Sequence, residues 1–143
     1  MASAVYNRGK QYVGTNGWVT PTYKVMLITS AYVFNVDHDF VSDLGAVELS
    51  GSGYVSGFGN SGRKSLAGKI VNLNDTDDRA EFDANDLTWT AIDAGTAAAC
   101  VVIREATSDA DSELIAYLDP NNIVTNGGDY TVQWATSGLF YIT

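Results

Sequence analysis

Residues 97–118 read AAACVVIREATSDADSELIAYL, and this stretch decides the fold class. Its first part, Ala97–Arg104, is a continuous apolar run, which is typical of a central strand covered on both faces. Residues 108–113 form an acidic turn, and Leu114–Leu118 is a second apolar run of strand length. The stretch therefore predicts two buried strands with a polar turn between them.

Further strands are expected on both sides of this stretch, at residues 23–29 (YKVMLIT), 47–56, 63–74, 87–91, 130–134 and 138–143. Turns rich in Gly, Asn and Asp separate them, and residues 87–91 and 130–134 alternate apolar and polar side chains as half-buried strands do. Roughly seven to nine short strands, with no confident helix for parallel crossovers, predict an all-β fold. We expect an antiparallel two-sheet sandwich, jelly-roll-like in character.

The segment before Trp18 is expected to stand apart from this sandwich. Tyr6, Gly9 and Val13 have helical spacing, but glycines weaken a helix, so residues 1–17 are expected as an N-terminal arm or short helix. A chain of 143 residues suits one hydrophobic core, so residues 18–143 are expected to form a single β-sandwich domain.

Charge is unevenly divided along the chain, whose net charge is −9. Residues 1–72 hold six basic and four acidic side chains, or +2, and residues 73–143 hold two basic and thirteen acidic ones, or −11. The acidic half repels phosphate backbones, so nucleic acid is not an expected partner. This uneven charge distribution has two explanations. Either the acidic residues serve only to keep the surface soluble, or the more basic half binds a partner while the acidic half faces solvent. No run of about 18 apolar residues is present, so no membrane partner is expected.

No set of residues makes a recognisable catalytic centre. Gly57-x-Gly59-x-x-Gly62 has dinucleotide-binding spacing, but residues 63–74 alternate like a strand where that motif needs a helix, so a hairpin loop is expected. Cys100 lies in an apolar run and His38 is the single histidine, so neither a Cys–His nucleophile nor a His/Cys metal centre is expected. We expect no enzyme and no cofactor, with a carboxylate hydrolase left as a minor alternative.

The acidic segment 75–86 does not match a calcium-binding EF-hand loop. Its sixth position is Ala80 and its twelfth is Asp86, where that loop needs Gly and Glu. A looser calcium site stays open, although capping of turns is the favoured role for these carboxylates.

The three tryptophans are expected in two environments. Trp89 and Trp134 fall on the apolar register of their strands and are expected in the core. Trp18 lies in a Gly/Thr/Pro stretch and is expected at the surface as a contact residue.

In their order and spacing, several segments resemble a family of small bacteriophage virion proteins. These segments are Trp18 and residues 23–44, 48–54 (ELSGSGY), 64–68 (KSLAG), 78–92 (DRAEFDANDLTWTAI), 100–105, 113–119 and 126–134 (NGGDYTVQW). The resemblance implies a β-rich, non-enzymatic component of the phage particle. Some such proteins are capsid decoration or cement proteins, commonly trimeric on the outer surface, and others are head or tail fibre components.

These observations predict a capsid decoration (cement) protein located in the virion. The expected partners are the major capsid protein and further copies of the chain in a homotrimer. The expected contact residues are Arg8, Lys10, Tyr12 and Trp18, in the more basic half of the chain. The alternative is a fibre or tail-associated module that binds host surface polysaccharide through exposed aromatic side chains.

Overall fold

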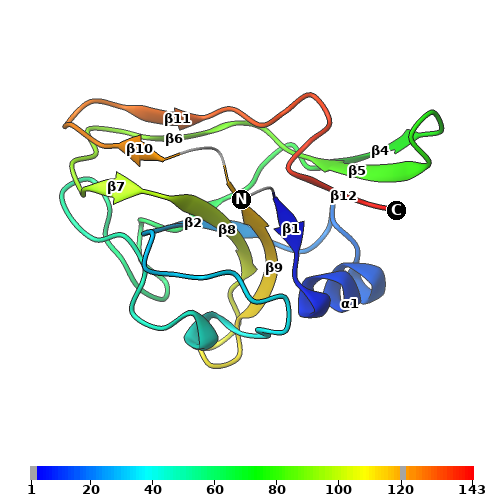
Figure 1. The fold of residues 1–143 in the computed structure, drawn as a ribbon, viewed down its shortest axis with the longest axis horizontal. Helices are drawn as coiled ribbons and strands as arrows, with labels where there is room; N and C mark the ends of the chain where they lie inside the picture. Colours follow the sequence, from blue (N-terminus) through cyan, green and yellow to red (C-terminus); the bar gives the residue numbers. More distant parts are fainter. Residues whose placement is uncertain (1–2, 120–121) are drawn as a thin grey trace.

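The computed structural model describes residues 3–119 and 122–143, and across these residues the fold is all-β and sandwich-like, with one short α-helix (Figure 1). The strands form several antiparallel sheets, none of them closed within the described residues, so the predicted fold class is confirmed. The elements are β1 (Ala4–Val5), α1 (Asn7–Asn16), β2 (Lys24–Ile28), the 3-10 turn η1 (Val41–Leu44), β3 (Lys64–Ser65), β4 (Ile70–Asn74), β5 (Arg79–Asp83), β6 (Leu87–Trp89), β7 (Thr96–Ala97), β8 (Ala99–Arg104), β9 (Glu113–Leu118), β10 (Ile123–Val124), β11 (Tyr130–Val132) and β12 (Phe140–Ile142).

The largest sheet has the strand order β1-β9-β8-β2-β3. The stretch at residues 97–118 supplies its β8–β9 hairpin, in which Cys100 pairs with Leu118 and Arg104 pairs with Glu113. No side chain in residues 99–103 is more than 1% exposed, as expected for a central strand with both faces covered.

Side chains on the two faces of this sheet belong to two different hydrophobic clusters. Val25 and Leu27 of β2 join the larger cluster, whereas Met26 and Ile28 join the smaller one, because successive strand side chains point to opposite faces. The larger cluster lies beneath the smaller sheets, and the smaller cluster is covered by residues 32–47 with η1. The five-stranded sheet is therefore the middle layer of the molecule.

The smaller sheets form an outer layer. One has three strands in the order β12-β5-β4, and two more are the ribbons β11-β6 and β10-β7. The β4–β5 hairpin extends beyond the body of the molecule (Figure 1). Asn74 stabilises its turn, because its side-chain oxygen accepts hydrogen bonds from the backbone N–H groups of Thr76 and Asp77.

In the segment expected as an arm or short helix, the described residues form β1 and α1, and residues 1–2 lie outside the described residues. β1 pairs with β9, and α1 packs on the same strand. The Gly9 backbone lies so close to Ile115 that any Cβ at this position would collide with the Ile115 backbone. Tyr6 and Val13 are buried, so residues 4–16 fold together with the sandwich.

Two of the expected strands are shorter than the pattern indicated. Residues 47–56 make only isolated bridges, such as Ile28 with Glu48, because two glycines and three serines interrupt the ladder. Residues 63–74 divide into β3 and β4, with a break at residues 66–69.

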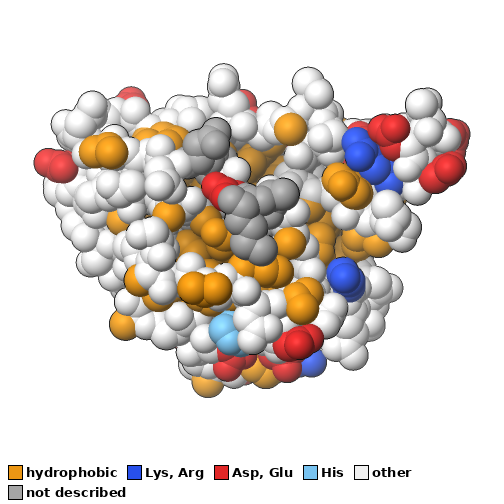
Figure 2. Space-filling view, in the orientation of Figure 1, with side chains coloured by type: hydrophobic (Ala, Val, Ile, Leu, Met, Phe, Trp, Pro, Cys, Tyr) orange, Lys and Arg blue, Asp and Glu red, His pale blue; other side chains and the backbone are white. Residues whose placement is uncertain are grey.

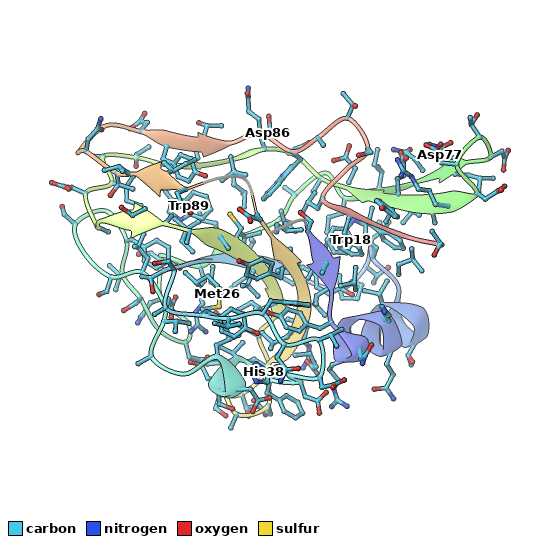
Figure 3. All side chains as sticks on the ribbon, in the orientation of Figure 1. Trp18, Met26, His38, Asp77, Asp86 and Trp89 are labelled. Atoms are coloured by element: carbon cyan, nitrogen blue, oxygen red, sulfur yellow. The ribbon has the colours of Figure 1, made fainter. Side chains whose placement is uncertain are left out.

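The expected surface position of Trp18 is wrong. Trp18 is 2% exposed, its ring stacks on Tyr23 at 4.7 Å between centroids, and its Nε1 donates to the Asp83 carbonyl at 2.9 Å. The indole fills the space between the main sheet and the three-stranded sheet, a position that its Gly/Thr/Pro neighbours do not reveal. Trp89 is buried as predicted, whereas Trp134 is only partly buried at the core's edge. Figure 3 shows Trp18 and Trp89 inside the molecule.

Candidate binding groove between two sheet edges

The four residues expected to contact a partner separate into different environments around α1. Arg8 lies over the Phe40 ring at 4.8 Å and donates to Gln11 Oε1 at 3.3 Å. Tyr12 is half-buried, with the Arg104 guanidinium 5.5 Å from its ring centroid. Lys10 is exposed and extends beside a hollow in the surface, and Trp18 is in the core. Arg8 and Lys10 of α1 are thus available for contact with a partner, whereas Trp18 is buried between the sheets and is not.

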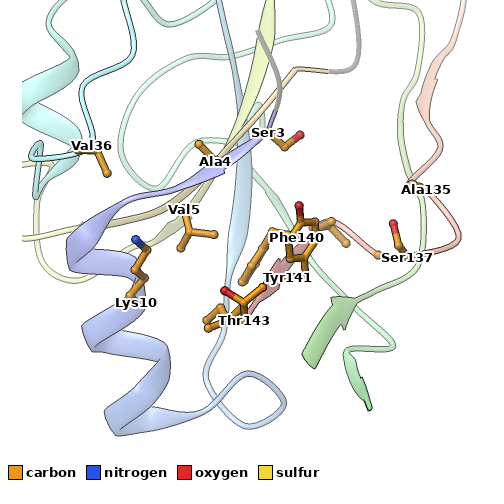
Figure 4. A pocket seen from close by; sticks show the side chains of 13 residues that line it. Ser3, Ala4, Val5, Lys10, Val36, Ala135, Ser137, Phe140, Tyr141 and Thr143 are labelled. Atoms are coloured by element: carbon orange, nitrogen blue, oxygen red, sulfur yellow. The ribbon is translucent and has the colours of Figure 1, made fainter. Parts of the chain in front are cut away.

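The hollow beside Lys10 is a groove of about 670 Å³ between β1 and β12, which we call the edge groove (Figure 4). Its apolar walls come from Ala4 and Val5 on one side and from Phe140 and Ile142 on the other, with Val36 at one end. A smaller hollow adjoins it and reaches Leu118 and Trp134. Figure 2 shows hydrophobic side chains gathered around this central depression.

Both walls of the edge groove are sheet edges that no other strand of the described residues pairs with. β1 is the last strand of the five-stranded order, and β12 is the last strand of the three-stranded order. The backbone of Tyr6 donates to Ile115, so by strand alternation the N–H and C=O of Val5 point away from β9. Open strand edges with apolar surface between them suit an extended peptide that adds as a further strand.

The chemistry of the edge groove favours binding. Lys10 is the only charged side chain among the described lining residues, and the rest are apolar or small polar groups. The groove therefore offers apolar surface and backbone hydrogen-bonding groups to a bound chain.

A second polar feature lies around Arg63, which directly precedes β3 at the edge of the main sheet opposite β1. Its side chain is 1% exposed and forms forked hydrogen bonds with Glu48, at 2.8 and 3.0 Å, and with Asp109, at 2.6 and 3.1 Å. Glu105 lies 3.5 Å from the same guanidinium. Burial lowers the pKa of Arg63, but the hydrogen bonds and charges of Glu48 and Asp109 outweigh this effect and raise it. This cation is therefore committed to internal ion pairs.

The glycine motif at residues 57–62 is a loop, as predicted, and it is followed by the short strand β3. Gly57 N–H donates to Glu48 at 3.1 Å, and Gly59 N–H donates to Glu105 at 3.1 Å. Carboxylates thus occupy the backbone donors that would cradle a phosphate in a dinucleotide site. The loop is held in place by the Arg63 network.

The remaining candidates for chemistry are also engaged in the fold. Burial raises the pKa of the Cys100 thiol to about 12, so the thiol is protonated at neutral pH. His38 Nδ1 is 3.1 Å from the Tyr32 hydroxyl. Within residues 3–119 and 122–143, no three His, Cys, Asp or Glu side chains are grouped to hold a metal ion, and Asp77 of the acidic segment pairs with Arg79.

Two sets of residues were missed from the sequence. Val5, Phe140 and Ile142 come together only in the fold, so no local signal marks the edge groove. The exposed strand β4 does carry a signal, because its residues, IVNLN, contain no charge and no proline to protect an edge.

No family model, curated protein or solved structure matches this chain. Among the described residues, no helix has the length and apolar character needed to cross a membrane.

Proposed function

We propose that this chain is a non-enzymatic structural protein of a bacteriophage particle, a capsid decoration protein that binds the major capsid protein and stabilises the shell. The resemblance of its ordered segments to phage virion proteins supports this role. The observation that carries the proposal is the edge groove, an apolar site between two open strand edges that suits assembly with another protein chain.

The internal contacts of the polar groups support a binding role over a catalytic one. The buried cation Arg63, the Cys100 thiol and the glycine loop all have structural roles. A protein on a particle surface must keep its shape without a disulfide here, since Cys100 is the single cysteine. The Arg63 network and the two-sided core of β8 provide that rigidity.

We assign the shell contact to the face of α1 that carries Arg8. Arg8 is partly exposed next to Phe40, and the guanidinium has donors left for carboxylates or carbonyls of a partner. Lys10, on the other side of the helix, faces the edge groove. The N-terminal helix thus offers two separate basic positions.

Binding to purified shells tests the proposal. The protein is mixed with capsids that lack it, and co-sedimentation is expected to saturate at a fixed ratio of copies per capsid. Arg8→Glu is expected to weaken binding by about tenfold or more, because like charges across an interface cost several kcal/mol. Lys64→Glu makes the same charge change on β3, at the edge of the main sheet opposite β1, and is the matched control.

Absence of the protein from particles would overturn the proposal. Immunogold labelling of intact phage should place it on the head surface. No label on particles, together with no sedimentation with shells, would reject the decoration role.

The alternative, a fibre module that binds host polysaccharide, receives less support from the tryptophans. Trp18 and Trp89 are at most 2% exposed, and Trp134 is partly buried, so they do not form an exposed stacking surface. A glycan array tests this alternative, and specific hits that depend on an exposed aromatic side chain such as Tyr141 would favour it.

A further inference from the structure

We propose that the edge groove binds strand β4 of a second copy of this chain, so that copies join head to tail by adding a strand. The inference deepens the proposed structural function and rests on it, since it names the occupant of the same groove. It is carried by the exposed edge of β4, by the register of the three-stranded sheet and by the charges at the two ends of the contact.

Strand β4 is an unprotected apolar edge. Ile70 is 49% exposed, Val71 is 46% exposed and Leu73 is 78% exposed. Proteins normally protect such an edge with a charge, a proline, a bulge or a cover, and residues 70–74 carry neither a charge nor a proline. The hairpin also stands away from the body of the molecule, where nothing in the described chain covers it (Figure 1). Pairing with a strand of another chain would explain why this exposed apolar edge lacks the usual protection.

The register shows where Val71 and Leu73 would fit. Val71 pairs with Phe82, which pairs with Phe140, and Leu73 pairs with Ala80, which pairs with Ile142. Two apolar rows therefore cross the sheet from β4 to β12 and end in the edge groove. A β4 strand from a second copy, added next to β12, would continue both rows with Val71 and Leu73 facing Val5 on the opposite wall.

The charges favour one direction of insertion. Within one copy, β4 and β12 are both antiparallel to β5, so they run in the same direction. In a ring whose rotation axis lies along the strands, every copy keeps that direction, so the added β4 runs parallel to β12 and its turn reaches the Thr143 end of the groove. Lys10 lies at this end (Figure 4), and the turn carries Asp75, Asp77 and Asp78. The cation of the groove thus meets the acidic turn of the neighbour.

The contact joins two unlike edges of one sheet, β12 on the acceptor and β4 on the donor. Such a heterologous contact forms a ring if the rotation between copies closes and an open chain if it does not. A ring of three is the closed form that agrees with the trimer implied by the resemblance. Each copy would supply one groove and fill the next.

The oligomer mass of a Leu73→Glu variant tests the contact directly. The wild-type chain is expected to elute with the mass of several 15.3 kDa chains, and Leu73→Glu with the mass of one. Leu73 is 78% exposed, so the substitution should leave the monomer folded, which circular dichroism and the melting temperature check. Val33→Glu is the matched control, because Val33 is 82% exposed on a loop outside the contact and should keep the oligomer.

A charge exchange tests the direction of insertion. Lys10→Glu and Asp75→Lys should each raise the dissociation constant of the oligomer about tenfold or more, and the double variant should recover most of the loss. Recovery in the double variant needs the two side chains to meet across the contact, which a structural role of either residue alone would not produce. Absence of recovery would overturn the parallel insertion.

The results separate this inference from the proposed function. A wild-type chain that stays monomeric at high concentration, or a Leu73→Glu variant that stays oligomeric, overturns the strand addition. Either outcome leaves shell binding to be decided by co-sedimentation. Failure of shell binding with an intact oligomer would reject the decoration role and retain the strand addition.

Discussion

At the scale of single residues, Arg63 joins parts of the chain that are far apart in the sequence. It binds Glu48 before the glycine loop, approaches Glu105 after β8, and binds Asp109 in the acidic turn. Glu48 and Glu105 in turn accept hydrogen bonds from the backbone N–H groups of Gly57 and Gly59. One guanidinium therefore stabilises both the glycine loop and the acidic turn. A buried cation with such partners is costly to remove, because the carboxylates stay behind without compensation.

Arg63→Ala is therefore expected to lower the free energy of unfolding by about 3–5 kcal/mol. Lys64→Ala, at the neighbouring residue, has no ion pair among the described residues and should change it by no more than about 0.5 kcal/mol. Urea denaturation of the two variants measures the difference. A loss below about 1 kcal/mol for Arg63→Ala would show that the network contributes little beyond an exposed salt bridge.

Cys100 provides a second prediction at this scale. Its side chain is 0% exposed and its thiol stays protonated, so a thiol reagent should react only when the structure opens. Labelling by a disulfide reagent in native buffer should be at least about 10³-fold slower than in denaturant, as expected for global opening of a stable domain. Labelling at the denatured rate in native buffer would contradict the central position of β8.

At the scale of elements, several hydrogen bonds within the turn between β8 and β9 converge on the Asp111 carboxylate. Asp111 accepts hydrogen bonds from the Thr107 hydroxyl and from the Ser108 N–H at 2.7 Å. The Thr107 hydrogen bond is the largest cause that lowers the pKa of Asp111, followed by that of Ser108, to about 2. The folded state thus favours ionised Asp111 more strongly than the unfolded chain does.

A lowered carboxyl pKa adds stability above its unfolded value, about 3.9, and this stability is lost as the pH falls toward about 2. The wild type should therefore lose stability with acid across this window more steeply than Asp111→Asn. Urea midpoints at several pH values from neutral to strongly acidic measure both slopes. Asp93→Asn, at an exposed carboxylate outside this turn and outside the proposed contact between copies, is the control and should keep the wild-type slope. Equal slopes for wild type and Asp111→Asn would contradict the prediction.

At the scale of the whole molecule, the sequence predicts well those strands whose own residues carry a clear hydrophobic pattern. The apolar run at residues 97–104 and the alternation at residues 87–91 carry their own signal, so β8 and β6 follow from them. Trp18 has no such signal, because its burial depends on Tyr23 and on Phe82 and Phe140, from distant parts of the chain. The edge groove and the Arg63 network could not be predicted from the sequence for the same reason, because each forms where segments distant in the chain come together.

The pairing of both early strands with late ones sets the order in which a growing chain can fold. Met26 of β2 pairs with Val101, and Val5 of β1 pairs with Ala116, so neither strand finds its partner until most of the chain has been synthesised. At about 5–20 residues per second, the N-terminal strands wait roughly 5–20 s for β8 and β9. The local β8–β9 hairpin then forms with little loop closure and offers edges on both sides. Folding is therefore expected to begin late in synthesis, with the β8–β9 hairpin, and the N-terminal strands β2 and β1 are expected to pair with that hairpin afterwards.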